Sequence, residues 1–583
     1  MRRKLQALLP PLSWLAHYDT RAFGRDLLAA IIMTVLVIPQ SLAYAILAGM
    51  PPEAGLYAST LPVVAYSIFA SSATLAVGPV AVIALMSATA VGEIVSQGIA
   101  GYAAASMMLA LMSGVILVAM GTFRLGFIAN FISHPVISGF ISGSALLIII
   151  SQLMPLLGID GGGRTSVEMV TTLVTGSGDV DPVTAIIGVC SILFLFLASK
   201  YAAKGLSAIG LPGAAALTIA KLAPMIAVII STLIVAVRGL SDNGVAVVSR
   251  VPGGLPALAV PVFDLALFEA LLLPAALISL IIFVESTAIA HRLASKRNER
   301  VNPNQELVAL GAANITAAIA GSFAVAGGFS RSAVNAAAGA QTQVAGVLTA
   351  LGIALVTLLL TDWLYYLPRA TLAAAIIVAV SSLVDIRAIR AVTRYSRADG
   401  TALVITLLVT VSVGVTPGIL SGIGLSLLLY LHRTSRPHTA VVGRIAGTEH
   451  FRNISRHQVD TVPHTLILRI DEGLYFANAR YLEDQIAQAI EHHPDVNNLV
   501  LMCTAVNHID TSALETLEAI NTRLEASGVR FHLSEVKGPV MDRLRQSDFL
   551  AELSGEVFLS TYDAWKALCE SNRSSVASNS ANT

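Results

Sequence analysis

The sequence predicts an all-α domain that crosses a membrane many times, followed by a small α/β domain. Composition gives the first indication: 55% of the 583 residues are hydrophobic and only 12% are charged, against about 25% charged residues in ordinary soluble domains. The second is a sharp change near Arg436, where recurring apolar runs give way to ordinary charge density. We therefore expect a transmembrane domain over residues 1–436, a linker with a first strand over 437–460, a soluble domain over 461–570 and a disordered tail over 571–583.

Fourteen candidate spans account for the apolar part, because each run of about 20 residues is long enough to cross a hydrocarbon core of about 30 Å. They begin near Leu27, Leu56, Leu75, Gly101, Gly126, Val183, Ile219, Leu265, Leu307, Phe323, Val344, Pro368, Thr401 and Gly418. With this count, the basic clusters at 292–300 and 387–397 fall on the same side as the N-terminus, and the positive-inside rule places that side in the cytoplasm. Both termini are then cytoplasmic. The opposite side carries Arg164, Arg238, Arg250 and Arg369.

One run, Ser322–Gly339, places an arginine where apolar residues are expected. Arg331 follows a Gly-Gly-Phe-Ser sequence and precedes small residues that predict a short helix. An extended segment followed by a helix start directs free backbone N–H groups and the positive end of the helix dipole at one point. Because an intramembrane arginine costs about 2.5–3.5 kcal/mol on insertion scales, we expect a partner for it. A bound anion would be one.

A second interrupted segment, Thr74–Met86, lies seven spans earlier. Gly78-Pro79 would break a helix there and restart it at mid-depth. Interrupted segments at matching places in two halves indicate an inverted repeat with the substrate bound between the halves. The sequence therefore predicts 7+7 inverted spans and an anion site where the two helices start.

The soluble domain alternates strands and helices. The predicted strands are Thr465–Ile470, Leu499–Cys503 and Val529–Val536. A helix is expected to begin at Asp510 or Ser512, since Ser512 and Glu515 have the spacing of a capping box. This pattern predicts a small α/β fold.

Several short motifs are specific when taken together. They are Pro39-Gln40-Ser41-Leu42-Ala43-Tyr44, Pro51–Tyr57, Gly78-Pro79, Asn304–Leu307, Gly328–Asn335, Ile509–Ala513 and Val536–Val540. The first five resemble the SulP anion permeases, which are related to the animal sulfate and anion exchangers, and the last two resemble a STAS domain. The resemblance covers nearly the whole chain.

The resemblance implies a fold of seven plus seven inverted spans, divided into a core and a gate domain, and a homodimer whose STAS domains lie in the cytoplasm and serve assembly and regulation. It implies a multi-pass protein of the bacterial cytoplasmic (inner) membrane. We expect secondary active transport of an inorganic oxyanion, sulfate above all, with proton symport by alternating access. A sodium-coupled bicarbonate transporter or a dicarboxylate transporter of the same fold is an alternative. An anion channel and a membrane-tethered STAS signalling protein are alternatives from other classes.

The predicted substrate site combines both interrupted segments with the first span. The segments contribute Gly78, Pro79, Val80, Ala81, Phe329, Ser330, Arg331 and Ser332. Gln40 and Tyr44 lie one helical turn apart and face one direction, so Gln40 would donate to the anion and Tyr44 would line the pocket. Packing without a direct role is an equal alternative for these two. For Arg331, the alternative is that it braces the helix start by pairing with a carboxylate or a carbonyl.

Glu285 is the predicted coupling residue because it lies in an apolar stretch. Removal from water disfavours the ionised carboxyl, so Glu285 would carry a proton, or ligate sodium together with Ser286 and Thr287. Proton-coupled members of the family resemble this chain in having Glu here, which favours protons. The alternative is a static ion pair with Arg331.

Thr511 lies where bacterial relatives of the STAS domain carry a phosphorylated hydroxyl, so the resemblance implies a regulatory site. The alternative is a simple helix cap, since helix starts favour Ser, Thr and Asp. The three cysteines are scattered without metal or redox spacing, and the net charge of zero gives no indication of nucleic-acid binding. We expect no enzymatic activity, no metal site and no cofactor other than the coupling ion.

Overall fold

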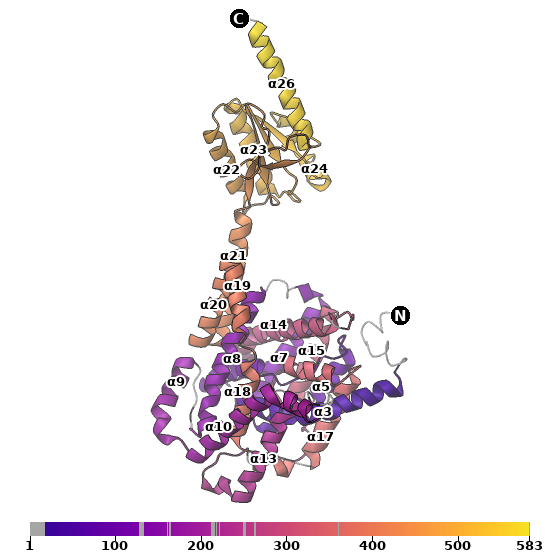
Figure 1. Cartoon of the computed structure of the whole chain (residues 1–583), viewed down its shortest axis with the longest axis vertical. Helices are drawn as coiled ribbons and strands as arrows, with labels where there is room; N and C mark the ends of the chain where they lie inside the picture. Colours follow the sequence, from indigo (N-terminus) through magenta and orange to yellow (C-terminus); the bar gives the residue numbers. More distant parts are fainter. Residues whose placement is uncertain are drawn as a thin grey trace. The chain divides into compact units, whose positions relative to one another are not determined.

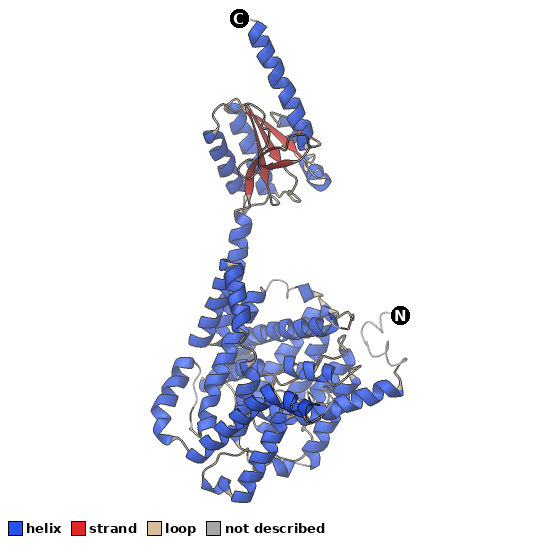
Figure 2. Cartoon of the chain, in the orientation of Figure 1, coloured by secondary structure: helices blue, strands red, loops and turns tan. Residues whose placement is uncertain are grey.

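The computed structural model describes residues 18–581 apart from 128–132, 160, 162–164, 211–215, 217–218, 221, 249–251, 260, 262–263, 296 and 360. Two of the arginines on the predicted external side, Arg164 and Arg250, therefore lie outside the described residues. The chain divides into two compact units, Met1–Ser426 and Leu427–Thr583. Figure 1 follows the chain from one end to the other, and Figure 2 shows that helices dominate the first unit while the larger sheet belongs to the second.

The first unit is built from helices, as its apolar composition predicts. In order they are α3 (Thr20–Leu47), α4 (Pro52–Tyr57), α5 (Leu61–Phe69), α6 (Ala81–Ser96), α7 (Tyr102–Thr122), α8 (His134–Leu157), α9 (Ser166–Thr175), α10 (Pro182–Leu197), α11 (Ala203–Ala208), α13 (Ala223–Arg238), α14 (Leu265–Ser295), α15 (Pro303–Ile319), α16 (Phe329–Ala337), α17 (Val344–Leu359), α18 (Arg369–Ser381), α19 (Ile386–Tyr395), α20 (Arg397–Ser412) and α21 (Val415–Ser435), which runs on into the second unit.

Seven helical stretches in the described part are long and apolar enough to cross a membrane. They are Thr20–Leu47, Tyr102–Thr122, His134–Leu157, Pro182–Ala208, Leu265–Ser295, Arg369–Tyr395 and Val415–Ser435. Three shorter apolar helices, α6, α13 and α17, accompany them. The helical membrane fold is thus confirmed, while the count of fourteen spans stays a prediction.

Both predicted interruptions are present, and they meet. The chain leaves α5 at Phe69, runs extended through β1 (Val77–Gly78) and restarts as α6. The second segment runs through β2 (Ala326–Gly327) into α16. The two strands pair antiparallel, with Val77 opposite Gly327. Two helices that are far apart in the sequence therefore begin at one crossing point.

The second unit is an α/β domain. Its strands are β3 (Thr439–Arg444), β4 (Phe451–Asn453), β5 (Thr465–Ile470), β6 (Asn498–Met502), β7 (Arg530–Ser534) and β8 (Val557–Phe558), and its helices after α21 are α22 (Ala479–His492), α23 (Thr511–Ala526), α24 (Gly538–Leu544), α25 (Phe549–Glu552) and α26 (Thr561–Ala581). The sheet order is β4-β3-β5-β6-β7-β8, with β5 to β8 parallel and β3 antiparallel to both its neighbours. The predicted strands form its centre.

Two details of this unit differ from the sequence prediction. The cap of α23 is Asp510, whose Oδ1 accepts a hydrogen bond of 2.9 Å from the backbone N–H of Ala513. Of the two predicted helix starts, Asp510 is therefore confirmed, and the expected capping box of Ser512 and Glu515 is wrong because the helix begins two residues before Ser512 could cap it. At the C-terminus, α26 continues to Ala581, where the sequence predicts a disordered tail.

Candidate functional site

The crossing of β1 and β2 is held by side chains from the two segments and from α14. The backbone N–H of Gly328 donates to the carbonyl of Ala76 at 3.1 Å. The Ser332 hydroxyl accepts from the N–H of Ala76 at 2.9 Å, and the Ser286 hydroxyl accepts from the N–H of Gly327 at 2.9 Å. Both serines, which we predicted to contact the anion or the coupling ion, hold the backbone that frames the site.

Arg331 is buried beneath the start of α6, with 3% of its surface exposed. Its Nη2 donates to the carbonyl of Pro79 at 2.6 Å, so the bracing contact to a carbonyl exists. Its Nη1 is buried and has no hydrogen-bond partner among the described residues. A Cβ at Gly78 would lie 2.1 Å from Nη1. Only glycine therefore lets the guanidinium approach so closely, and the two N–H donors of Nη1 have no described partner.

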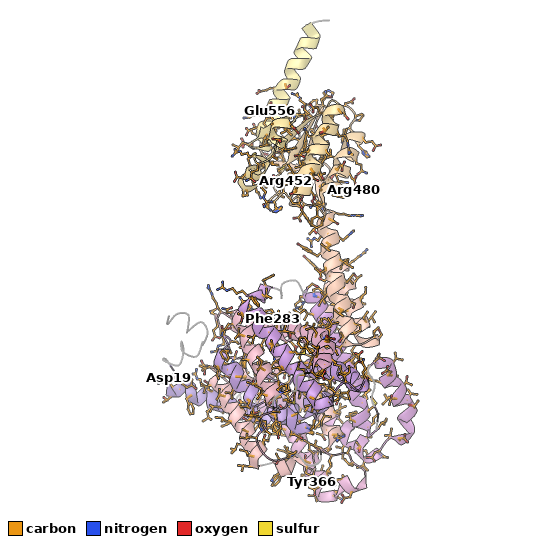
Figure 3. All side chains as sticks on the ribbon, turned by 180° about the vertical axis from the view of Figure 1, so that it is seen from behind. Asp19, Phe283, Tyr366, Arg452, Arg480 and Glu556 are labelled. Atoms are coloured by element: carbon orange, nitrogen blue, oxygen red, sulfur yellow. The ribbon has the colours of Figure 1, made fainter. Side chains whose placement is uncertain are left out.

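Glu285 lies on α14 two residues after Phe283, which is fully buried and labelled in Figure 3. One carboxyl oxygen, Oε2, is buried and has no hydrogen-bond partner in the described part of the chain, and the same holds for the Thr287 hydroxyl. No ion pair joins Glu285 to Arg331 among the described residues. The alternative of a static pair is therefore wrong for this conformation.

Tyr44 lies near both Arg331 and Glu285. It is 9% exposed on α3, and its phenol lies close enough to Arg331 and Glu285 for their charges to act on it. Gln40, one turn earlier, is half-buried. The structure thus brings Tyr44, Arg331 and Glu285 into one neighbourhood although they come from three different helices.

The start of α16 lies at the surface of the unit. Ser330 is exposed and Phe329 is 44% exposed, whereas Gly78, Pro79 and Ala81 are buried and Val80 is half-buried. There the Arg292 guanidinium lies 5.5 Å from the centre of the Phe329 ring. Sequence reasoning missed Arg292 as a neighbour of the site. Its spacing of seven residues from Glu285, which places both on one side of α14, was the available signal.

A small cavity of about 20 Å³ borders Arg331 on its other side, lined in part by Ser59, Asn335 and Gln343. The Asn335 Oδ1 is buried there without a partner in the described chain. Space of this size is on the scale of one water molecule, so this cavity is too small to hold an oxyanion.

A buried carboxylate holds the chain that leads into β1. Glu306, on α15, is fully buried and accepts from the Tyr66 hydroxyl at 2.7 Å, from the N–H and hydroxyl of Ser71 at 2.9 and 2.7 Å, and from the N–H of Ser72 at 2.8 Å. The amide of Asn335 donates to the carbonyl of Thr74 at 3.1 Å. The extended segment is thus fixed along its length before α6 begins.

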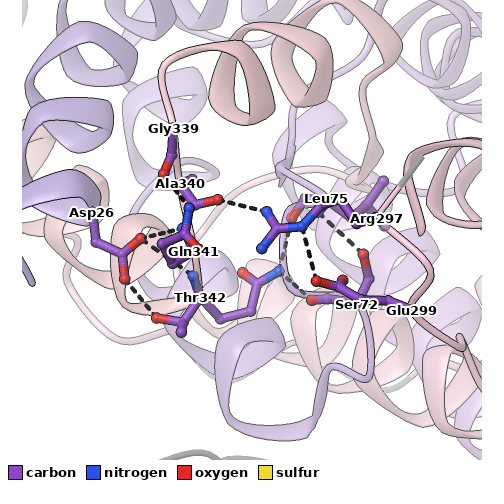
Figure 4. Close-up of polar contacts among 10 residues, drawn as sticks. Asp26, Ser72, Leu75, Arg297, Glu299, Gly339, Ala340, Gln341 and Thr342 are labelled. Carbon is purple, nitrogen blue, oxygen red and sulfur yellow. Dashed lines mark hydrogen bonds and ion pairs between the residues drawn. The ribbon is translucent and has the colours of Figure 1, made fainter. Parts of the chain in front are cut away.

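The loop from α16 to α17 is held in the same way (Figure 4). Asp26, buried on α3, accepts from the N–H of Gln341 at 2.6 Å and from the N–H and hydroxyl of Thr342 at 3.2 and 2.6 Å. Arg297 donates to the carbonyl of Ala340 at 2.7 Å. Gln343 donates to the carbonyls of Ser72 and Leu75, which joins this loop to the other interrupted segment. Both helix starts therefore belong to one hydrogen-bonded frame.

Thr511 is the first residue of α23 and is exposed. Because Asp510 supplies the cap, the Thr511 hydroxyl is not needed for that purpose. Its role as a regulatory site stays a prediction.

Family models match both parts of the chain. Residues 23–406 match the sulfate permease family, and residues 456–564 match the STAS domain. The first match alone covers more than half of the sequence.

Similar sequences include several named as sulfate transporters. Probable sulfate transporter 4.2 of Arabidopsis thaliana is 34% identical over 96% of this chain and 83% of its own length. A probable sulfate transporter of Mycobacterium tuberculosis is 32% identical over 92% of this chain and 93% of its own length.

Among solved structures, the murine Slc26a9 anion transporter in its inward-facing state has a TM-score of 0.89 at 23% identity, covering 97% of this chain and 95% of that one. The transmembrane domain of a cyanobacterial bicarbonate transporter, BicA, has a TM-score of 0.59 at 22% identity, covering 70% of this chain and 98% of that one. At these identities the likeness supports the fold alone.

Proposed function

Since the chain belongs to the sulfate permease family, we propose that it is a secondary active transporter of an inorganic oxyanion, with sulfate as its substrate. Relatives named as sulfate transporters at 32–34% identity over nearly the full chain support this choice. The function is therefore transport rather than catalysis.

The observation that carries the proposal is the half-satisfied Arg331 between two helix starts. Its free Nη1 and the unpaired N–H groups of the first turns of α6 and α16 all favour negative charge. The N-caps of both helices, Val80 and Gly328, make no side-chain cap hydrogen bond. An oxyanion offers several acceptor oxygens to such a set of donors.

We propose that Glu285 couples this transport to protons. A neutral, protonated Glu285 is compatible with a partnerless buried oxygen, whereas a carboxylate there would be uncompensated. Tyr44 lies near both Glu285 and Arg331, so a change of charge at Glu285 would alter the field at the proposed anion site. Proton and anion would then move together in each cycle of alternating access.

The proposal extends to the assembly and its setting. We propose a homodimer in the bacterial inner membrane, with both termini in the cytoplasm and regulators binding to the STAS domain. The described residues contain no cluster that could hold a metal ion, and the proposal requires no cofactor besides the coupling proton.

Uptake into proteoliposomes that contain the full chain tests the function. Labelled sulfate should enter saturably and should accumulate when the outside is acidified. Selenate should compete strongly, whereas bicarbonate, fumarate and chloride should compete weakly. Preferential competition by bicarbonate or fumarate would reassign the substrate, and uptake that neither saturates nor responds to a pH gradient would indicate a channel.

A further inference from the structure

A second polar space lies apart from the helix starts. It is a cavity of about 520 Å³, large enough for a hydrated oxyanion, between α3 and α6 on one side and α8 and α18 on the other. Thr89, Ser151 and Gln152 contribute polar groups to its wall. In Figure 1, α8 and α18 run side by side below α14, and the two helices pack against each other.

Arg369 is the one charged side chain among the described residues that line this cavity. It is exposed and forms no ion pair with any described residue. A cation without a described ion-pair partner, placed at the wall of a partly open polar cavity, produces a positive potential in that cavity, because the low-dielectric walls concentrate its field.

The position of Arg369 is fixed by the backbone around it. Val247 and Pro368 form an antiparallel bridge, and the N–H of Arg369 donates to the carbonyl of Ala246 at 2.9 Å. The N–H of Val248 donates to the carbonyl of Leu367 at 2.9 Å. Arg369 is also the first residue of α18, so the positive end of that helix adds to its charge.

The cavity shares two helices with the substrate site. Its wall includes Leu85, one helical turn after Ala81 at the start of α6, and Ala43, the neighbour of Tyr44 on α3. Four residues of α-helix span about 6 Å. The predicted topology places this end of α3, α8 and α18 on the external side, opposite the basic clusters.

We propose that this cavity is a separate capture site for the anion, in which Arg369 holds the substrate at low affinity before it reaches the helix starts. This inference rests on the proposed anion transport and adds an external site to it. Electrostatic capture raises the local concentration of an anion without contributing to the translocation step, so it acts on KM and on salt dependence.

The potential can be measured without transport. In the full chain, Ser151→Cys places a thiol in the cavity wall. A negatively charged, membrane-impermeant methanethiosulfonate should modify it several-fold faster than the positively charged reagent, and Arg369→Gln in the same background should remove this preference. The chain without Ser151→Cys is the reagent control, since Cys190 is exposed. Equal rates for the two reagents with Arg369 present would overturn the proposal.

Uptake by intact cells tests the functional part. Arg369→Gln should raise KM for sulfate about fivefold or more at low ionic strength, with the maximal rate within about twofold, and the difference should shrink as salt screens the charge. Arg369→Lys should retain most of the effect, and Arg394→Gln, an exposed arginine on α19 outside the cavity, should leave KM unchanged. An unchanged KM, or a loss of maximal rate alone, would contradict capture. If sulfate is not the substrate, the parent chain should take up no sulfate, while the Ser151→Cys thiol should still react faster with the negatively charged reagent.

Discussion

Arg331 has a carbonyl for one of its two terminal nitrogens and nothing described for the other. A guanidinium that served only to brace the start of α6 would be expected to have its remaining N–H groups satisfied, because a buried donor without a partner costs about 1–3 kcal/mol. The contact to Pro79 positions the group, and Nη1, which has no described partner, is the donor that our proposal assigns to a substrate oxygen.

Arg331→Ala should lower kcat/KM for sulfate at least about 100-fold, since a hydrogen bond to a charged group contributes about 1.5–3 kcal/mol and the brace on Pro79 is lost as well. Arg331→Lys should retain part of the activity, because lysine carries the same positive charge but lacks the planar guanidinium and its paired N–H donors. Initial uptake rates in proteoliposomes measure both. Persistent uptake by the alanine variant with unchanged affinity would show that the site lies elsewhere.

Glu285 should determine the pH dependence of transport. Uptake by the parent chain should rise as the external pH falls, since more of the carboxyl is protonated and ready to move with the anion. Glu285→Gln, a permanently neutral mimic of the protonated acid, should make the rate independent of pH and abolish accumulation against a gradient.

The matched control is Glu269→Gln, an exposed carboxyl on the same helix, which should retain the pH profile of the parent chain. If Glu285→Gln still concentrated sulfate under an inward proton gradient, Glu285 would not be the coupling residue.

At the scale of elements, the site depends on two short strands whose pairing brings two helix starts together. Neither strand would persist alone, because isolated two-stranded pairs are marginal in water. Glu306, Asn335 and Gln343 hold the first segment at successive positions, so the crossing is set by buried side chains rather than by the strands themselves.

Gly78→Ala should therefore disable transport without unfolding the protein. The added Cβ would lie 2.1 Å from Arg331 Nη1 at a φ of +155° that disfavours alanine, so the guanidinium would have to leave the position that the proposed anion site requires. We expect at least a tenfold loss of uptake. Gly24→Ala, with no atom within 4 Å of its new Cβ, should behave as the parent chain, and equal activity of both variants would contradict this geometry.

Glu306→Ala should destabilise the membrane domain by about 3–5 kcal/mol, because it leaves the N–H groups of Ser71 and Ser72 and two hydroxyls without their acceptor. Thermal unfolding of the purified protein in detergent, followed by size-exclusion chromatography, measures the change. Glu306→Gln, which keeps one acceptor oxygen, should lose less. A melting temperature equal to that of the parent chain for Glu306→Ala would show that the segment is held by other contacts.

At the scale of the whole molecule, the two units follow different physical rules. The first places apolar side chains outward, as on α10 and α13, where Ile186, Phe196 and Leu233 are more than half exposed, which suits a lipid environment. The second has a compact core around its parallel strands, with Leu499, Leu501 and Phe531 fully buried. Stability measurements on the second unit are therefore interpretable by the rules for soluble domains.

His532 should make the STAS domain less stable in acid. Burial, with a smaller contribution from Arg530, lowers the pKa of His532 to about 4, below its ordinary value of about 6.5. Its Nδ1 accepts from the N–H of Glu556 at 2.9 Å, and Nε2 lies 3.2 Å from the Asn498 Oδ1. The folded state thus holds a neutral ring, while the unfolded chain takes up a proton below pH 6.5.

The contribution of His532 to the free energy of unfolding is therefore fully present above pH 6.5 and decreases as the pH falls from 6.5 to 4. At pH 5 the loss should be about 1–2 kcal/mol. Denaturation of the full chain, followed by fluorescence of Trp565 after Trp14 and Trp363 are replaced by Phe, measures the loss. His532→Gln should flatten the profile between these pH values. A parent profile that is already flat would show that the ring is protonated when folded.

Composition and neighbouring residues were enough to predict the class of the protein and its division into domains. Low charge and long apolar runs required a membrane, the change near Arg436 separated two kinds of domain, and Gly78-Pro79 and the residues before Arg331 indicated two broken helices. These are local properties, since hydropathy, proline and glycine act within a few residues of their position in the chain.

Which side chains contact one another became visible in the folded chain alone. The hydrogen bond from Arg331 to Pro79 spans 252 residues, and nothing near either residue in the sequence specifies it. The use of Ser286 and Ser332 as backbone braces, the absence of a described pair between Glu285 and Arg331, and the cavity at Arg369 likewise arise from packing between distant helices. Each of these features depends on which buried donors and acceptors are brought together by contacts between distant parts of the chain. Local sequence patterns do not specify those contacts.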